Sequence, residues 1–345
     1  MAQETHTRQE AEGMSIPFFV RLSRVRTVTV LAAVALLSGP VFAKTPFPTK
    51  PVRLVVTLPA GSSPDVMARF IAERLSKDLG QQVIVENKPG ASSVIGTDAV
   101  AKAPADGYAL LFATSSSVSI NPHLFSKLPY KASDFVPVIH LVNVPVVLVV
   151  RADSPYKSLD DLVQAAKREA VRLNYASYGE GTQTHLAAVQ LLQRTGAIMT
   201  HVPVKNGGVS DVIGGAVDWT FATPNIALAH IKAGKLRALA VSANARLPGL
   251  PGTPTFSELL PGMESLESWN GILAPRGTPS EVLHRLQSAL QKIAESSEFR
   301  KKALELDLIP TGGTAEEFRS FLAKDYVKWG AVVKRTGIRL DEPVK

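Results

Sequence analysis

The sequence predicts an α/β protein of two lobes, each a mostly parallel sheet flanked by helices. Apolar strand patterns alternate with helix patterns over most of residues 52–335, which is the order expected of parallel sheets with helices on both faces. Two segments interrupt this alternation, and several loops made of small residues follow predicted strands. Since ligands of such sheets bind outside the carboxyl ends of the strands, a site is expected at these loops.

Composition narrows the class of protein. A chain of 345 residues can form one large or two medium domains, and 45% apolar with 20% charged residues is typical of a globular protein. The formal charge of +8 is spread along the chain without a basic run interleaved with aromatics, which disfavours nucleic acid as a partner. The chain has no cysteine, so disulfides and thiolate metal sites are excluded.

The N-terminal segment predicts export. Arginines at positions 21, 24 and 26 precede the apolar run Val28–Leu37, and residues 41–43 fit a small-x-small cleavage pattern. We therefore expect a signal peptide over residues 1–43, cleaved after Ala43, and a periplasmic mature protein. Met14 is an alternative start that gives an ordinary basic n-region. The apolar run is too short for a confident transmembrane span, and an uncleaved anchor is the alternative.

The periodicity assigns the elements in order. Strands are expected near residues 52–57, 83–86, 109–113, 146–151, 173–176, 200–203, 217–222, 237–242 and 271–274. Helices are expected near residues 65–79, 94–102, 159–169, 183–195, 208–214, 225–233, 279–295, 297–306 and 314–335. Helix starts carry matching residues, such as Thr314 three positions before Glu317 in a capping box.

Two segments are predicted to be hinges. Phe135–Val150 is continuously apolar and leads from a first α/β block into a second, and Ala245–Leu260 is rich in Pro and Gly and leads back. One lobe is then expected to contain residues 44–143 and 257–345. The other is expected to contain residues 144–256.

Four loops of one composition follow predicted strands, namely 59–64, 114–122, 177–184 and 223–225. They supply hydroxyls, amides or free backbone N–H groups. Helix starts at strand ends leave N–H groups unpaired, and such donors hold an anion without an Arg or Lys. The interpretation is a protein that captures a small anion between two lobes.

Catalytic patterns are missing from the sequence. It contains no G-x-S-x-G, G-K-[ST] or H-E-x-x-H motif, and His201 and His230 lack metal-ligand spacing. Ser177 and His185 are the one pair that suggests a nucleophile and base, but His185 falls one turn into a predicted helix, where a structural donor is expected. No catalytic residue, metal or cofactor is predicted.

Several sequence blocks carry a resemblance to a known family. They are Val85–Ala91, Ala103–Tyr108, Asn174–Thr182 with His185-Leu186, Ala233–Val241, Pro254-Thr255 with Glu258, and Trp269–Pro275. With these blocks in this order, nearly the whole mature chain resembles the Bug receptors, the extracytoplasmic solute-binding proteins of the tripartite tricarboxylate transporter system. The resemblance implies a Venus-flytrap fold of the periplasmic-binding-protein type II class. It also implies carboxylate contacts from the loops at 58–65 and 177–182.

The chain departs from the family pattern near the expected pocket. Leu58 stands where an aromatic residue is usual, and Val204 stands where Tyr is usual. These smaller residues suggest a pocket widened for a bulkier acid.

The predicted ligand-binding residues come from both lobes. They are Leu58, Gly61, Ser62, Asp65, Ser115, Ser116, Ser177, Gly179, Gly181, Thr182, His185, Thr223, Asn225 and Trp269. Asp65 is expected to cap the helix and organise its loop rather than contact an anion, because two negative charges repel. Trp269, with Asn270, is expected either to close the crevice or to be a packed core aromatic.

The predicted function is capture of a small dicarboxylate, tricarboxylate or aromatic acid, by a protein expected to be monomeric. The partners are the ligand and the membrane permease of a tripartite tricarboxylate-type secondary transporter. One alternative is a ligand-sensing co-receptor for a sensor kinase. Another is a periplasmic hydrolase of a small acid that uses Ser177 and His185.

Overall fold

The computed structural model describes residues 47–341 except 169–171, 205 and 264. The predicted signal peptide, its cleavage after Ala43 and the alternative start at Met14 lie outside the described residues. Within the described part of the chain, no helix is long and apolar enough to cross a membrane.

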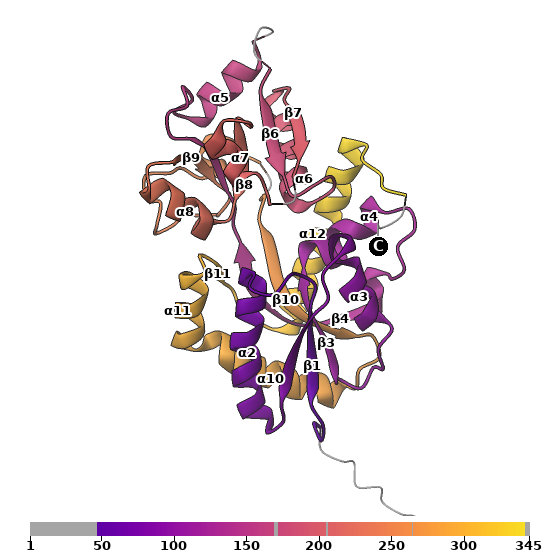
Figure 1. Cartoon of the computed structure of the whole chain (residues 1–345). Helices are drawn as coiled ribbons and strands as arrows, with labels where there is room; N and C mark the ends of the chain where they lie inside the picture. Colours follow the sequence, from indigo (N-terminus) through magenta and orange to yellow (C-terminus); the bar gives the residue numbers. More distant parts are fainter. Residues whose placement is uncertain (1–46, 169–171, 205, 264, 342–345) are drawn as a thin grey trace, which may run out of the picture. The chain divides into compact units, whose positions relative to one another are not determined.

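The first sheet has six strands in the order β11-β4-β10-β3-β1-β2 (Figure 1). Their bounds are β1 Val52–Val56, β2 Val83–Asn87, β3 Ala109–Thr114, β4 Phe135–Val144, β10 Ser268–Pro275 and β11 Ile309–Pro310. The β1 strand pairs in parallel with β2 and β3. The β10 strand is antiparallel to β3 and β4, and β11 is antiparallel to β4.

The second sheet has five strands in the order β7-β6-β8-β5-β9. Their bounds are β5 Val147–Arg151, β6 Asn174–Ser177, β7 Thr200–Pro203, β8 Trp219–Ala222 and β9 Leu236–Val241. The β6 strand is parallel to β7 and β8, whereas β5 is antiparallel to β8 and β9.

The predicted α/β class is confirmed, but the expectation of mostly parallel sheets is wrong because both sheets are mixed. The predicted hinge Phe135–Val150 is mainly two strands, β4 and β5, with only residues 145 and 146 between them. The chain thus passes from one sheet to the other without a crossover helix. Each antiparallel pair includes a strand at one of the two crossings between the sheets: β4 or β5 on the way out, or β10 on the way back.

Helices cover the sheets, and most begin within two residues of the predicted position. Their bounds are α2 Ser63–Leu79, α3 Val94–Ala101, α4 Asn121–Leu124, α5 Leu159–Ala166, α6 Gln183–Thr195, α7 Val209–Gly214, α8 Pro224–Lys232, α9 Phe256–Leu259, α10 Ser280–Glu295, α11 Ser297–Glu305 and α12 Ala315–Thr336. Short turns of helix are η1 Ala91–Ser93, η2 Ser116–Ile120 and η3 Ala132–Asp134. The expected loop at 114–122 is therefore wrong, since it contains η2, which is a π turn, and the start of α4.

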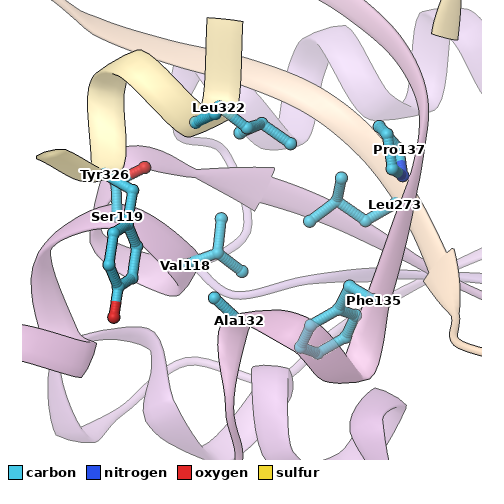
Figure 2. Close-up of a pocket in the computed structure, with 9 residues that line it drawn as sticks. Val118, Ser119, Ala132, Phe135, Pro137, Leu273, Leu322 and Tyr326 are labelled. Carbon is cyan, nitrogen blue, oxygen red and sulfur yellow. The ribbon is translucent and has the colours of Figure 1, made fainter. Parts of the chain in front are cut away.

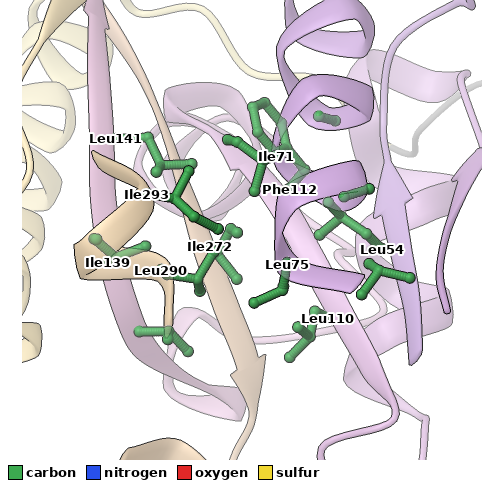
Figure 3. Close-up of a cluster of buried hydrophobic side chains, with 14 of the residues drawn as sticks. Leu54, Ile71, Leu75, Leu110, Phe112, Ile139, Leu141, Ile272, Leu290 and Ile293 are labelled. Atoms are coloured by element: carbon green, nitrogen blue, oxygen red, sulfur yellow. The ribbon is translucent and has the colours of Figure 1, made fainter. Parts of the chain in front are cut away.

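Alternation along the strands gives the first sheet two buried faces. On one face, Leu110 and Phe112 of β3 pack with Ile71 of α2 and Leu290 of α10 (Figure 3). On the other face, residues such as Leu111 pack with α12 and the turns after β3. Burial on both faces explains why these strands have nearly continuous apolar sequences.

The second sheet is built in the same way. Tyr175 and Trp219 pack with residues of α5 and α6, while Val149 and Ala176 pack with residues of α7 and α8. Because α2 and α6 are anchored by these cores, the loops that precede them have fixed ends.

Candidate functional site

The helices α2, α6 and α8 follow strands with parallel partners, and their first N–H groups have no side-chain cap; α3, α4, α7 and α10 also begin without one. The N-cap residues of α2, α6 and α8 are Ser62, Thr182 and Thr223, all in extended backbone and none with a capping hydrogen bond. By contrast, the N-cap side chains of α5, α9, α11 and α12 each accept a backbone N–H. The hydroxyl residues that could cap α2, α6 and α8 are present but do not do so. The free N–H groups and the positive end of each helix dipole favour an anion there.

Asp65 organises the loop between β1 and α2. Its Oδ2 accepts from the Gly61 N–H at 2.9 Å and from Arg69 Nε at 3.0 Å, and its Oδ1 accepts from Asn87 Nδ2 at 2.8 Å. Burial alone would raise the pKa of this carboxyl, but the hydrogen bonds from Arg69, Gly61 and Asn87 outweigh it and hold the pKa below its ordinary value. Both oxygens of Asp65 are thus engaged in the loop, but the N-cap of α2 is Ser62 and not Asp65, so the expectation that Asp65 caps the helix is wrong.

Asn87, the last residue of β2, is a partner of this loop that sequence reasoning missed. Its Nδ2 also donates to the Leu58 carbonyl oxygen at 3.1 Å, so the end of β2 holds both ends of the first loop. Its position at the carboxyl end of a parallel strand beside β1 could have pointed to it. Leu58 itself is half-buried against the core, and the Ser62 hydroxyl donates to the Pro59 carbonyl oxygen at 2.7 Å.

The loop between β6 and α6 is held by its own polar atoms. The Gly179 carbonyl oxygen accepts from Thr182 Oγ1 at 2.7 Å, and the Gly179 N–H donates to Ser177 Oγ at 3.1 Å. The Gly181 N–H donates to His185 Nδ1 at 3.0 Å. These two N–H groups already donate within the loop. The backbone N–H groups that remain without a side-chain cap belong to the first turn of α6.

The structure pairs Ser177 with a different histidine from the one that the sequence suggested. Ser177 Oγ lies 2.7 Å from His201 Nε2, while His185 contributes an acceptor to the loop rather than the expected donor. The two imidazole rings stack with centroids 3.9 Å apart and planes at 11°. Sequence reasoning treated His201 as isolated because it lies 24 residues beyond Ser177, on the neighbouring strand β7.

Burial controls the charge of both histidines. It lowers the pKa of His185 to about 4, with a further lowering from His201. Burial also lowers the pKa of His201, and the nearby Glu180 partly opposes that shift. The pair is therefore neutral at pH 7.

The other predicted residues have varied surroundings. Thr223 Oγ1 donates to Asn225 Oδ1 at 2.6 Å at the start of α8. Ser115 is fully buried with its Oγ 2.6 Å from Ser268 Oγ, so its hydroxyl is already engaged, whereas Ser116 is half-buried at the start of η2. The described contacts join neither Thr223 nor Asn225 to the first loop.

Trp269 belongs to the core in this structure. It is 1% exposed, and its Nε1 donates to Asp325 Oδ2 at 2.7 Å. Lys328 Nζ lies 2.6 Å from the other oxygen of Asp325. The structure therefore favours the core alternative for Trp269, and its neighbour Asn270 is buried as well.

One contact brings loops of the two sheets together. A Cβ placed on Gly181 would lie 2.3 Å from Leu124 Cδ2, so the β6–α6 loop lies directly against α4, which follows β3. A second close approach involves Tyr178, whose ring lies over Gly207 with its Cζ 2.5 Å from a Cβ placed there. Both contacts depend on the absence of a glycine side chain.

A separate apolar cavity of about 180 Å³ lies among η2, β4, β10 and α12 (Figure 2). Its lining is Val118, Ser119, Ala132, Phe135, Pro137, Leu273, Leu322, Ala323 and Tyr326. It offers no charged group and contains none of the predicted ligand residues. In the described part of the chain, no group of three or more His, Cys, Asp or Glu residues could hold a metal ion.

Two mixed sheets flanked by helices, with uncapped helix starts at the carboxyl ends of parallel strands, define a solute-binding protein of the periplasmic type. The family model of the tripartite tricarboxylate transporter family receptor matches residues 67–338. The chain belongs to this family of receptors.

Relatives agree with this assignment. Protein BugT of Bordetella pertussis is 35% identical over 317 residues, which is 91% of this chain and 97% of BugT. A solved R. palustris protein with adipate is 33% identical with a TM-score of 0.76, over 85% of this chain and 99% of that one. MatC from Rhodopseudomonas palustris with bound malate is 28% identical with a TM-score of 0.73, over 83% of this chain and 100% of that one.

Proposed function

We propose that the chain is a periplasmic solute-binding protein that captures a small carboxylate between the loops of its two sheets. It then delivers that ligand to the membrane permease of a tripartite tricarboxylate-type transporter. The observation that carries this proposal concerns the helices whose N-cap residue is a Ser or Thr in extended backbone: those of α2, α6 and α8 leave the first N–H groups uncapped, whereas those of α5, α9, α11 and α12 cap them. Export with cleavage after Ala43, and lobes formed by residues 44–143 with 257–345 and by 144–256, are parts of the same proposal.

The ligand class follows from the donors. Backbone N–H groups at helix starts bind a carboxylate by charge-assisted hydrogen bonds and need no arginine or lysine. Two structural relatives are described with adipate and with malate, which are both dicarboxylates. Dicarboxylates are therefore the first candidates, followed by tricarboxylates and aromatic acids.

A thermal unfolding screen of residues 44–345 tests the proposal. A carboxylate at 100 times its dissociation constant should stabilise the native state by about 2.7 kcal/mol. We expect a rise of a few degrees in Tm with one class among adipate, malate, succinate, citrate and benzoate. The matching amide should cause no shift, because it carries no negative charge.

A screen in which no acid raises Tm calls for a second measurement. If no acid shifts Tm, native mass spectrometry of the purified protein must show a bound acid that already fills the site. A protein that is empty and unresponsive to every acid would exclude carboxylate capture.

Ser177→Ala separates a receptor from a hydrolase. Ser177 is fully buried and engaged with Gly179 and His201, so it lacks the exposed position that a nucleophile needs. We expect S177A to weaken binding of the acid found in the screen, because Gly179 and His201 lose their partner. No turnover of esters or amides of that acid is expected for either protein, whereas turnover by the wild type that is lost in S177A would establish a hydrolase.

A further inference from the structure

The stacked imidazoles of His185 and His201 contact the β6–α6 loop through Gly181 and Ser177. His185 is 5% exposed and stands in the first turn of α6, while His201 comes from β7. Tyr175 of β6 stacks on His201 with ring centroids 5.1 Å apart, and on Trp219 of β8 with centroids 5.0 Å apart. The histidine pair is thus packed against Tyr175 of the neighbouring strand β6, and Tyr175 is itself held by Trp219 of β8.

The Gly181 contact fixes the protonation state of His185. Because the Gly181 N–H donates to Nδ1, this nitrogen must carry a lone pair and the ring must be neutral. A proton on Nδ1 would point at the N–H of Gly181 and would break the hydrogen bond. It would also place a positive charge against the face of His201, 3.9 Å away.

Few neighbouring groups can compensate such a charge. The titratable groups near the pair are Tyr175 on β6, whose pKa burial raises to about 12, and the exposed Glu180 in the loop. The α4 helix presents the apolar Leu124 to Gly181. At the start of α6, Gln183 Nε2 donates to the Leu266 carbonyl oxygen, next to the buried carboxyl of Glu267.

We propose that His185 is a positioning residue of the carboxylate site. Its unprotonated Nδ1 accepts the Gly181 N–H, and this hydrogen bond keeps the loop and the uncapped N–H groups of α6 in place. Protonation of the stacked pair opens the loop and releases the ligand. This inference rests on the proposed function, since it assumes that the β6–α6 loop receives the carboxylate. It makes the site a receptor that holds its ligand at neutral pH and releases it in acid.

The direction of the pH dependence follows from the buried ring. Above the ordinary value of 6.5, His185 is neutral in both the closed and the opened loop, and the closed loop has its full stability. As pH falls from 6.5 towards 4, the opened loop takes up the proton more readily than the closed loop. Affinity should therefore fall in this window.

Hydrogen exchange of the Gly181 amide tests the positioning role without any ligand. In the wild type, the protection factor of this amide should fall about tenfold or more between pH 7.5 and 4.5, after correction for the intrinsic exchange rate. His185→Asn keeps an acceptor where Nδ1 lies and cannot titrate in this range, so protection should be retained at both pH values. His185→Phe keeps a ring but has no acceptor, so protection should be low at both. His284→Asn, the same change on an exposed residue of α10, should behave like the wild type.

Binding of adipate and malate by calorimetry completes the test. The ratio of wild-type to H185N dissociation constants cancels the titration of the ligand itself, and it should rise about tenfold between pH 7.5 and 4.5. A constant ratio, or wild-type protection that does not change with pH, would overturn the inference. If the exchange pattern is as expected but neither acid binds, His185 positions the loop as inferred and the choice of carboxylate as ligand is what fails.

Discussion

Gly181→Ala is expected to weaken carboxylate binding by at least about tenfold and to lower the stability of the protein. A Cβ at this position would lie 2.3 and 3.1 Å from the two methyl carbons of Leu124, and real Cβ atoms essentially never approach closer than 3.0 Å. Leu124 is fully buried in the core of the first sheet, so it cannot simply turn away. The β6–α6 loop must then move off α4, and the first turn of α6 moves with it. Calorimetric titration with the acid found in the screen measures the loss.

Gly196→Ala is the matched control for this change. Gly196 ends the same helix with φ of +69°, against +72° for Gly181, and a Cβ there meets nothing within 4 Å. Both variants therefore carry the same left-handed backbone strain, which costs about 1 kcal/mol, and only G181A has the clash. Equal affinities of G181A and G196A would show that contact with α4 does not set the position of the loop. Adding Leu124→Ala to G181A should restore binding in part, although the cavity left by leucine costs about 2–5 kcal/mol of stability.

Asp65→Ala is expected to lower the free energy of unfolding by about 2–4 kcal/mol and to remove ligand binding. The change removes the charged acceptor of the part-buried Gly61 N–H and Asn87 amide, and a hydrogen bond to a charged group contributes about 1.5–3 kcal/mol. Arg69 is half exposed and can be solvated by water, so the loss of its ion pair with Asp65 adds little to the destabilisation. Without these bonds the loop of Leu58–Ser62 loses its fixed shape at the start of α2. Urea unfolding and titration with the identified acid measure the two effects.

The control for this change is Asp160→Ala, an exposed aspartate in the first turn of α5. It removes a similar charge at a helix start, and its effect should stay below about 1 kcal/mol. The pH dependence adds a second check. Because the folded-state pKa of Asp65 is lowered, its contribution is fully present above the ordinary value of 3.8 and is lost as pH falls through the lower folded value. A D65A variant as stable as D160A at pH 7 would contradict the organising role of this carboxylate.

Local patterns were enough to predict most of the fold. Apolar runs and capping residues placed the starts of all helices except the short α4 and α9 within two residues, because hydrophobic periodicity and caps such as Thr314 with Glu317 are properties of neighbouring residues. The antiparallel pairing of β4 with β10 was not predictable in this way. It joins residues more than 120 positions apart, such as Ser268 with Val144, and depends on how the chain crosses between sheets.

The same distinction between local patterns and distant contacts applies to the candidate site. The sequence by itself determined the family, the positions of the small-residue loops after strands, and the residue types that they supply. Only the tertiary structure decided which groups those residues bond: Asn87 to Asp65, His201 to Ser177, and Leu124 against Gly181. It also placed Trp269 in the core beside Asp325. The physical reason is that periodicity and caps act over a few residues, whereas burial and hydrogen-bond partners are set by strands that become neighbours only when the sheets form.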